Sequence, residues 1–204
     1  KTKNIGTDSD RALLLDFQAT LETKPEKAIK LEKDALAQIE NITADNARLV
    51  SNLHANLGGL YRMNGHPDLA REHMEKSISL LDQFNLLHIN DSIPQIANYA
   101  MFLTEQQEPE RGISELQKLS GIIKEYHSDD CLDYAKVQET LGTIYLMTAN
   151  LPQAKTHFKK AFKIYEKIWA DEPEMIEAKY QEIQELYPQI GFCIGKNLSG
   201  LLTK

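Results

Sequence analysis

The sequence has few of the features that mark secreted, membrane or metal-binding proteins. Its 204 residues include only two cysteines, Cys131 and Cys193. These stand far apart, without the spacing of a zinc site or a disulfide framework. No apolar run approaches the about 20 residues that a transmembrane helix needs, and the N-terminal stretch KTKNIGTDSDR lacks the apolar segment of a signal peptide. We therefore expect a cytoplasmic protein without membrane contact.

The sequence also has no excess of basic residues, and it contains few of the residues that break helices. The formal net charge is −7, whereas a protein that follows nucleic-acid phosphates needs a basic face. We therefore expect no direct binding of nucleic acid. Glycine (10 residues) and proline (7 residues) are scarce, while 42% of the residues are hydrophobic. Such a chain should fold, and its wealth of Ala, Leu, Lys and Glu favours an all-α protein.

Two stretches of the sequence resemble one another. NLGGLYRMNGHPDLAREHMEKSIS occupies residues 56–79, and TLGTIYLMTANLPQAKTHFKKAFK occupies residues 140–163, 84 residues later. A weaker copy lies halfway, at residues 98–120, and a further one precedes residue 56. The prolines keep the same 42-residue step, with the last one residue late: Pro25, Pro67, Pro109 and Pro152. Four degenerate copies of a 42-residue unit therefore cover about residues 8–170.

Each copy is predicted to form a pair of helices. In the second copy Leu53, Leu57 and Tyr61 have the spacing of one helical face, and Gly65-His66-Pro67 then ends that helix. The helix that follows has a predicted buried face of Leu69, Ala70, Met74, Ser77, Ile78 and Leu81.

Small residues are expected where the two helices of a pair cross. Gly58 and Gly142 lie on the first helix of their copies, and Ala70 and Ala154 lie on the second. A larger side chain at these positions would hold the helix axes beyond the usual spacing of about 8–10 Å. Because one pair cannot bury its apolar stripe alone, the copies should stack on one another.

The Leu-Gly-x-x-Tyr motif at Leu57 and Leu141, with the break near Gly65 and the alanines Ala70 and Ala154, resembles the tetratricopeptide repeat. The usual unit of that family is 34 residues, and a 42-residue period is similar to the longer-helix variants in kinesin light chains and bacterial peptide-sensing regulators. The resemblance covers about four fifths of the chain, although the third copy lacks the glycines. It implies a right-handed α-α superhelix of about four helix pairs, a solenoid whose concave groove binds a protein or peptide.

The repeat register predicts one solenoid over residues 1–204. Its four copies are expected at about residues 8–44, 45–86, 87–128 and 129–170. A capping helix and a tail should occupy residues 171–204, with the helix at about 173–187. The tail, QIGFCIGKNLSGLLTK, fits either a short amphipathic helix or the start of a further copy.

In the tetratricopeptide family the first helix of each pair lines the concave groove. An asparagine amide there offers a donor and an acceptor to an extended main chain, and methionine adapts to irregular apolar side chains. Alternatively, Asn56 and Asn98 cap or brace neighbouring helices. The expected peptide-binding residues are Asn52, Asn56, Arg62, Met63, Asn98, Met101, Glu105, Lys136, Glu139 and Thr143.

The first helix of the first copy departs from this pattern. Its groove-side stripe is mostly apolar and consists of Asp10, Leu14, Phe17 and Leu21, whereas a terminal repeat needs a polar outer face. We expect upstream residues or a partner to cover this side, with self-association as one possibility. The chain begins at Lys1 rather than Met, which fits a piece of a longer protein.

No catalytic, cofactor or metal constellation stands out, and we expect no enzyme. His73 is expected on a solvent-leaning face. Cys131 lies near a probable helix start, which lowers a thiol pKa, or it is buried and idle. The charged run KPEKAIKLEKD is expected to be a solvated helix face with i, i+4 pairs.

The leading hypothesis is a non-enzymatic module that binds a protein or peptide segment and forms part of a larger protein. One alternative is the ligand-sensing domain of a bacterial transcription regulator. The other is a purely structural or oligomerisation array whose groove is never used. The mass in solution and the response to added peptide distinguish these alternatives.

Overall fold

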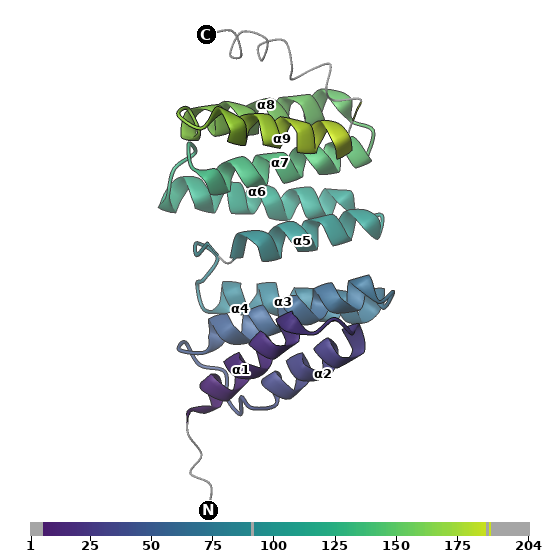
Figure 1. Ribbon diagram of the computed structural model, residues 1–204, viewed down its shortest axis with the longest axis vertical. Helices are drawn as coiled ribbons and strands as arrows, with labels where there is room; N and C mark the ends of the chain where they lie inside the picture. The colour runs from purple at the N-terminus through teal and green to yellow at the C-terminus, as the bar shows by residue number, and fades with distance from the viewer. Residues whose placement is uncertain (1–5, 91, 187, 189–204) are drawn as a thin grey trace, which may run out of the picture. The chain divides into compact units, whose positions relative to one another are not determined.

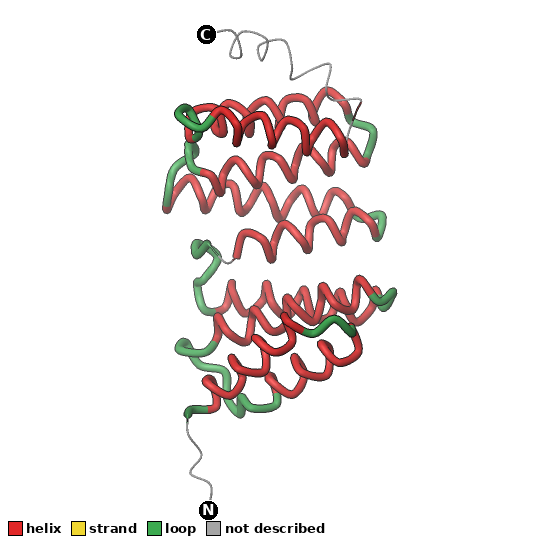
Figure 2. The backbone as a smooth tube through the Cα atoms, in the orientation of Figure 1, coloured by secondary structure: helices red, strands yellow, loops and turns green. Residues whose placement is uncertain are grey.

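The computed structural model describes residues 6–90, 92–186 and 188. Every regular element within these residues is a helix (Figure 2), which confirms the all-α prediction. The chain divides into two compact units, with the boundary after Phe102, and each is described separately. The predictions for Cys193, Tyr187 and the tail from residue 189 lie outside the described residues. In the described part of the chain, no helix has the length and apolarity to cross a membrane.

Unit 1 consists of two helix pairs followed by the start of a third. α1 packs against α2, α3 packs against α4, and α2 also contacts α3, as Figure 1 shows. The residues of α5 up to Phe102 belong to this unit. Its helices are α1 (Asp8–Leu21), α2 (Pro25–Leu36), α3 (Ala47–Met63), α4 (Pro67–Gln83) and the first part of α5 (Ser92–Glu105).

Unit 2 also consists of packed helices. α6 contacts α7, and α7 packs closely on α8. Tyr180 of α9 (Pro173–Leu186) stacks on Phe162, with ring centroids 4.2 Å apart, so α9 covers part of the apolar face of α8. The helices of unit 2 are α6 (Pro109–Tyr126), α7 (Leu132–Met147), α8 (Leu151–Ile168) and α9 (Pro173–Leu186).

The predicted break between the helices of a pair recurs at one backbone position. Gly65, Gln107 and Ala149 stand 42 residues apart, and all have left-handed φ angles, of 72°, 64° and 58°. After each, the next N–H bonds back to a carbonyl five residues earlier, as in His66 N to Tyr61 O at 2.9 Å. This is the Schellman termination. Only the first of the three positions is a glycine, the residue that adopts this conformation without strain.

The predicted crossing of small residues is confirmed. A Cβ atom built on Gly58 would lie 2.6 Å from Met74 Cγ, and one built on Gly142 would lie 2.8 Å from the ring of Phe158. Ala70 and Ala154 are fully buried. Leu69 was predicted to be buried but is 40% exposed, because it lies in the first turn of α4 beside the solvent-exposed Pro67 and Asp68.

Candidate functional site

Two adjoining pockets hollow the surface of unit 1 over α3. They share Ala55, Gly59, Met63 and Asn98, and together they are called the α3 groove below. The pocket toward α4 and α5 has an open volume of about 600 Å³, and its other lining residues are Arg62, Met74, Ser77 and Gln95. The pocket toward α1 and α2 has an open volume of about 890 Å³, and its other lining residues are Ala19, Thr20, Glu22, Thr23, Pro25, Ala28, Glu32, Asn56 and Leu60.

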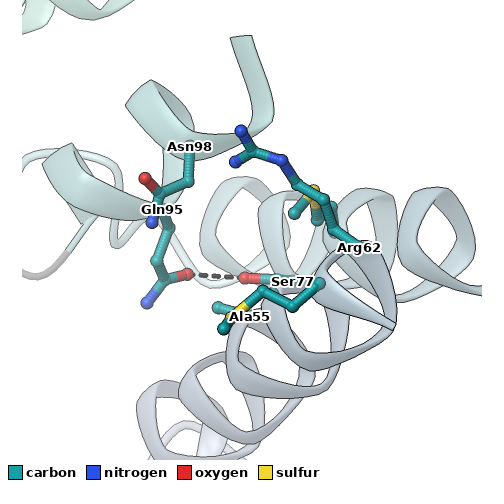
Figure 3. A pocket seen from close by; sticks show the side chains of 8 residues that line it. Ala55, Arg62, Ser77, Gln95 and Asn98 are labelled. Carbon is teal, nitrogen blue, oxygen red and sulfur yellow. Dashed lines mark hydrogen bonds between the residues drawn. The ribbon is translucent and has the colours of Figure 1, made fainter. Parts of the chain in front are cut away.

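A buried polar network forms the floor of the groove on the α5 side. Gln95 Oε1 accepts hydrogen bonds from Ser51 Oγ at 2.8 Å and from Ser77 Oγ at 2.5 Å. Its Nε2 donates to Asn52 Oδ1 at 2.6 Å. The predicted residue Asn52 therefore does not line either pocket, and its oxygen instead holds the start of α5 against α3. Figure 3 shows Gln95 reaching Ser77 beneath the opening.

Asn56 joins three helices. Its Nδ2 donates to Asp16 Oδ1 of α1 at 2.9 Å and to Glu32 Oε1 of α2 at 3.1 Å. The amide nitrogen is therefore occupied in bracing neighbouring helices, as the alternative interpretation of Asn56 expects. No described residue donates to the amide oxygen, and Asn56 lines the groove. The acceptor half of this amide thus remains available.

Asn98, by contrast, makes no hydrogen bond to any other residue that the structure describes. It is exposed and lines both pockets. Arg62 faces the same opening from α3 (Figure 3). Met63 lies beside it with 83% of its surface exposed. These three predicted residues come together at one place on unit 1.

The other predicted residues do not line the α3 groove. Met101 is half-buried on α5, and Glu105 is exposed on the part of α5 that belongs to unit 2. Lys136 is exposed and lies 3.9 Å from Asp133 of its own helix. The hydroxyl of Thr143 donates to a backbone oxygen of α7.

Glu139 has a structural position in unit 2. It accepts a hydrogen bond from the Tyr165 hydroxyl at 2.6 Å and pairs with Lys179 Nζ at 3.0 Å. These contacts join α7 to α8 and α9. Burial, then the charge of Glu139, raise the pKa of Tyr165, so this hydroxyl stays a donor.

Unit 2 has a pocket of its own that the predicted residues do not form. It has an open volume of about 810 Å³, and it lies on α6 and the C-terminal end of α7 rather than beside the residues expected there. Its lining residues are Pro109, Glu110, Ile113, Ser114, Gln117, Tyr145, Thr148 and Asn150.

The prediction that His73 is a surface residue was wrong. Its Nδ1 lies 2.9 Å from His54 Nδ1, and its ring stacks on Tyr61 with centroids 5.4 Å apart. Burial lowers the pKa of both histidines, that of His54 to about 4 with a contribution from His73. Unit 2 repeats the arrangement, because Tyr145 stacks on His157. The two rings of each contact come from different helices of a pair, so the spacing of residues along the sequence does not reveal the contact.

The solvated interpretation of KPEKAIKLEKD was wrong for one residue. Glu32 is 1% exposed, whereas all four lysines of this run are exposed. Its spacing from Ala28 and Ala35, both buried, places all three on one face of α2. That spacing is the signal that sequence reasoning missed.

The described residues contain no cluster of three or more His, Cys, Asp or Glu side chains that could hold a metal ion. Cys131 is half-buried at the start of α7, where its Sγ accepts from Tyr134 N at 3.4 Å and donates to Ser128 O at 3.1 Å. It serves as the cap of that helix.

Comparisons with known proteins agree with this architecture. Residues 92–167 match the model of the tetratricopeptide repeat family. The crystal structure of BtubC (BKLC) from P. vanneervenii is similar, with a TM-score of 0.65 and 19% identity over 78% of this chain and 62% of that one. A crystal structure of nearly identical TPR-like repeats, from a candidate kinesin light chain of Podosopora anserina, has a TM-score of 0.69 and 13% identity over 82% of this chain and 81% of that one.

These two likenesses concern the fold, since both identities are low. This chain spans less than two thirds of the length of the BtubC chain. No curated protein matches the sequence. Tetratricopeptide repeats are generally protein-interaction modules and non-enzymatic scaffolds. With its paired helices, its Leu-Gly-x-x-Tyr motifs and these likenesses of fold, the chain is an all-α helical-repeat solenoid whose residues 92–167 match the tetratricopeptide repeat family.

Proposed function

We propose that the α3 groove binds an extended segment of a peptide or protein. The observation that carries the proposal is the free amide of Asn98, which lines both pockets without a hydrogen bond to any described residue. The oxygen of Asn56 offers a second acceptor in the same groove. An extended main chain presents alternating donors and acceptors that such amides satisfy.

The apolar content of the groove supports the same conclusion. Met63 is 83% exposed beside Ala55 and Gly59, and a flexible thioether adapts to irregular side chains. The floor beneath is held by the hydrogen bonds of Gln95. A preorganised floor reduces the ordering cost that weakens peptide binding.

Selection from a phage-displayed library of random dodecapeptides tests the proposal. Fluorescence anisotropy then measures the affinity of the selected peptides for the wild type and for Asn98→Ala. We expect Asn98→Ala to weaken binding about tenfold, since a polar group of the peptide loses its partner. Asn41→Ala, an exposed asparagine outside the groove, should leave the affinity unchanged. Equal affinity of both variants would place the peptide elsewhere.

A second candidate function is assembly through the outer face of α1. Leu14, Phe17 and Leu21 are 58%, 60% and 68% exposed, and an apolar face of this kind is typical of interaction surfaces. Sedimentation velocity over a range of concentrations tests this candidate with the wild type and Phe17→Glu. Association that the substitution abolishes supports assembly, and a wild type that stays monomeric at all concentrations rejects it.

A further inference from the structure

Glu32 lines the α3 groove, and its carboxyl group shares the Asn56 amide with that of Asp16. Asp16 of α1 and Glu32 of α2 meet at the amide nitrogen of Asn56, which donates to one oxygen of each, at 2.9 and 3.1 Å. No lysine, arginine or histidine in the described part of the chain forms an ion pair with either carboxyl. The pair therefore lacks the partner that buried charges normally have.

One carboxylate oxygen of the two residues has no hydrogen-bond donor within the described ranges. Glu32 is 1% exposed, and its Oε2 has no hydrogen-bond partner among the residues that the structure describes. A buried carboxylate in that state is costly unless it is protonated or paired. Burial, then the neighbouring Asp16 carboxylate, raise the pKa of Glu32 to about 8, against the Asn56 amide, which lowers it. In the empty groove Glu32 therefore holds a proton at neutral pH.

The surroundings of Glu32 favour a cationic ligand over an anionic one. On the α1 and α2 side of the groove, the ionisable lining residues are Glu32 and Glu22, and no lysine, arginine or histidine of the described chain lines this pocket. The backbone N–H of Lys24 donates to the Glu22 carboxylate at 3.0 Å and lowers its pKa, so Glu22 stays ionised. Arg62 lines the other pocket, toward α5. The pocket of Glu32 therefore offers carboxyl groups and, among the described residues, no cationic side chain to a ligand.

We propose that Asp16 and Glu32 receive a basic side chain, lysine or arginine, of the segment bound in the α3 groove. The inference rests on the proposed function and names the chemistry of its ligand. The ammonium or guanidinium donates to Glu32 Oε2 and replaces the proton on that carboxyl. The Asn56 oxygen remains free for the main chain of the same segment.

A double-mutant cycle on the phage-selected dodecapeptides tests the inference. Each peptide with a lysine is compared with its norleucine analogue, and each with an arginine is compared with its citrulline analogue. We expect a common basic residue in the selected peptides, and removal of its charge should weaken binding to the wild type about tenfold or more. With Glu32→Gln the charged and uncharged peptides should bind equally.

Glu26→Gln is the matched control, because Glu26 is an exposed glutamate in the first turn of the same helix and does not line the groove. It should keep the full preference for the charged peptide. Thermal unfolding of each variant checks that the fold is intact. Peptides that bind without a basic residue, or a preference that survives Glu32→Gln, would overturn the inference while the proposed function stands. Failure to select any peptide would reject both.

Discussion

Substitution of Gly142 by alanine should destabilise unit 2, although alanine is the better helix former. The new methyl group would lie 2.8, 2.9 and 3.1 Å from three atoms of the Phe158 ring. That ring is fully buried and cannot bend away as a flexible chain end would. Overpacking of a core costs about 1–3 kcal/mol, whereas alanine in place of glycine inside a helix gains about 0.5–1 kcal/mol. The net loss should be about 1 kcal/mol, within a range of about 0–2.5 kcal/mol.

Gly121→Ala is the matched control in the same unit. A Cβ atom built on Gly121 of α6 meets nothing within 4 Å, so this variant should keep the helix gain of about 0.5–1 kcal/mol. Urea unfolding followed by the fluorescence of Trp169 measures both variants. Trp169 is the single tryptophan of the sequence, and it stacks on Tyr165 of α8. The fluorescence therefore reports on the packing of α7 against α8, where Gly142 lies.

The two substitutions should change the free energy of unfolding in opposite directions. Phe158→Leu combined with Gly142→Ala should recover part of the loss, because the smaller side chain makes room for the methyl group. If Gly142→Ala were as stabilising as Gly121→Ala, close helix crossing would not be the reason for the glycine.

Three further predictions follow from the structure. Unfolding measured by circular dichroism with Glu32→Gln should become easier as the pH falls from about 6.5 toward 4, since burial lowers the pKa of His54 and His157 to about 4. Each histidine lowers the free energy of unfolding by less than about 1.4 kcal/mol per pH unit because both rings are partly screened, and a flat profile would contradict this. In the wild type the change should be smaller, because the raised pKa of Glu32 stabilises the fold as the pH falls. Glu139→Gln should cost unit 2 about 1–3 kcal/mol in urea, and an unchanged midpoint would show that its two donors find other partners. Ala149→Gly should raise the free energy of unfolding in urea by about 0.5–1 kcal/mol, because the left-handed backbone conformation strains alanine. Gln107→Gly should have a similar effect. A lower free energy of unfolding would mean that the turn tolerates alanine.

The helix pairs and their crossings could be predicted because they follow from local periodicity. The spacing of Leu53, Leu57 and Tyr61 defines one face of a helix, and all three are buried. Gly58 and Gly142 stand where another helix must approach, and a Cβ atom at either would meet its neighbour. Such features depend on residues that are close in sequence or one repeat apart.

The terminations at Gln107 and Ala149 were harder to predict. They have the same left-handed backbone as Gly65, but neither carries the glycine that signals it. The repeat register alone locates them, since both lie a whole number of 42-residue steps after Gly65.

The polar contacts of the groove were not predictable from one-dimensional patterns. Asn56 was expected on the groove face, and it lines the groove. Its bonds to Asp16 and Glu32, however, join residues 40 and 24 positions away. The partner of Asn52, Gln95, lies 43 positions away on another helix. Which amide braces the fold and which remains free depends on these contacts, so Asn98 and Asn56 looked equivalent in the sequence.

Titration of a ¹⁵N-labelled chain with a selected peptide, followed by NMR, tests groove binding most directly. The side-chain amides of Asn98, Asn56 and Gln95 each give their own NH₂ signals and sample the groove from α5 and α3. We predict that the Asn98 signals move most, that those of Asn56 follow, and that residues on the outer face of α1 do not respond. Shifts confined to α1 around Phe17, with the signals of Asn98 unmoved, would contradict binding in the α3 groove.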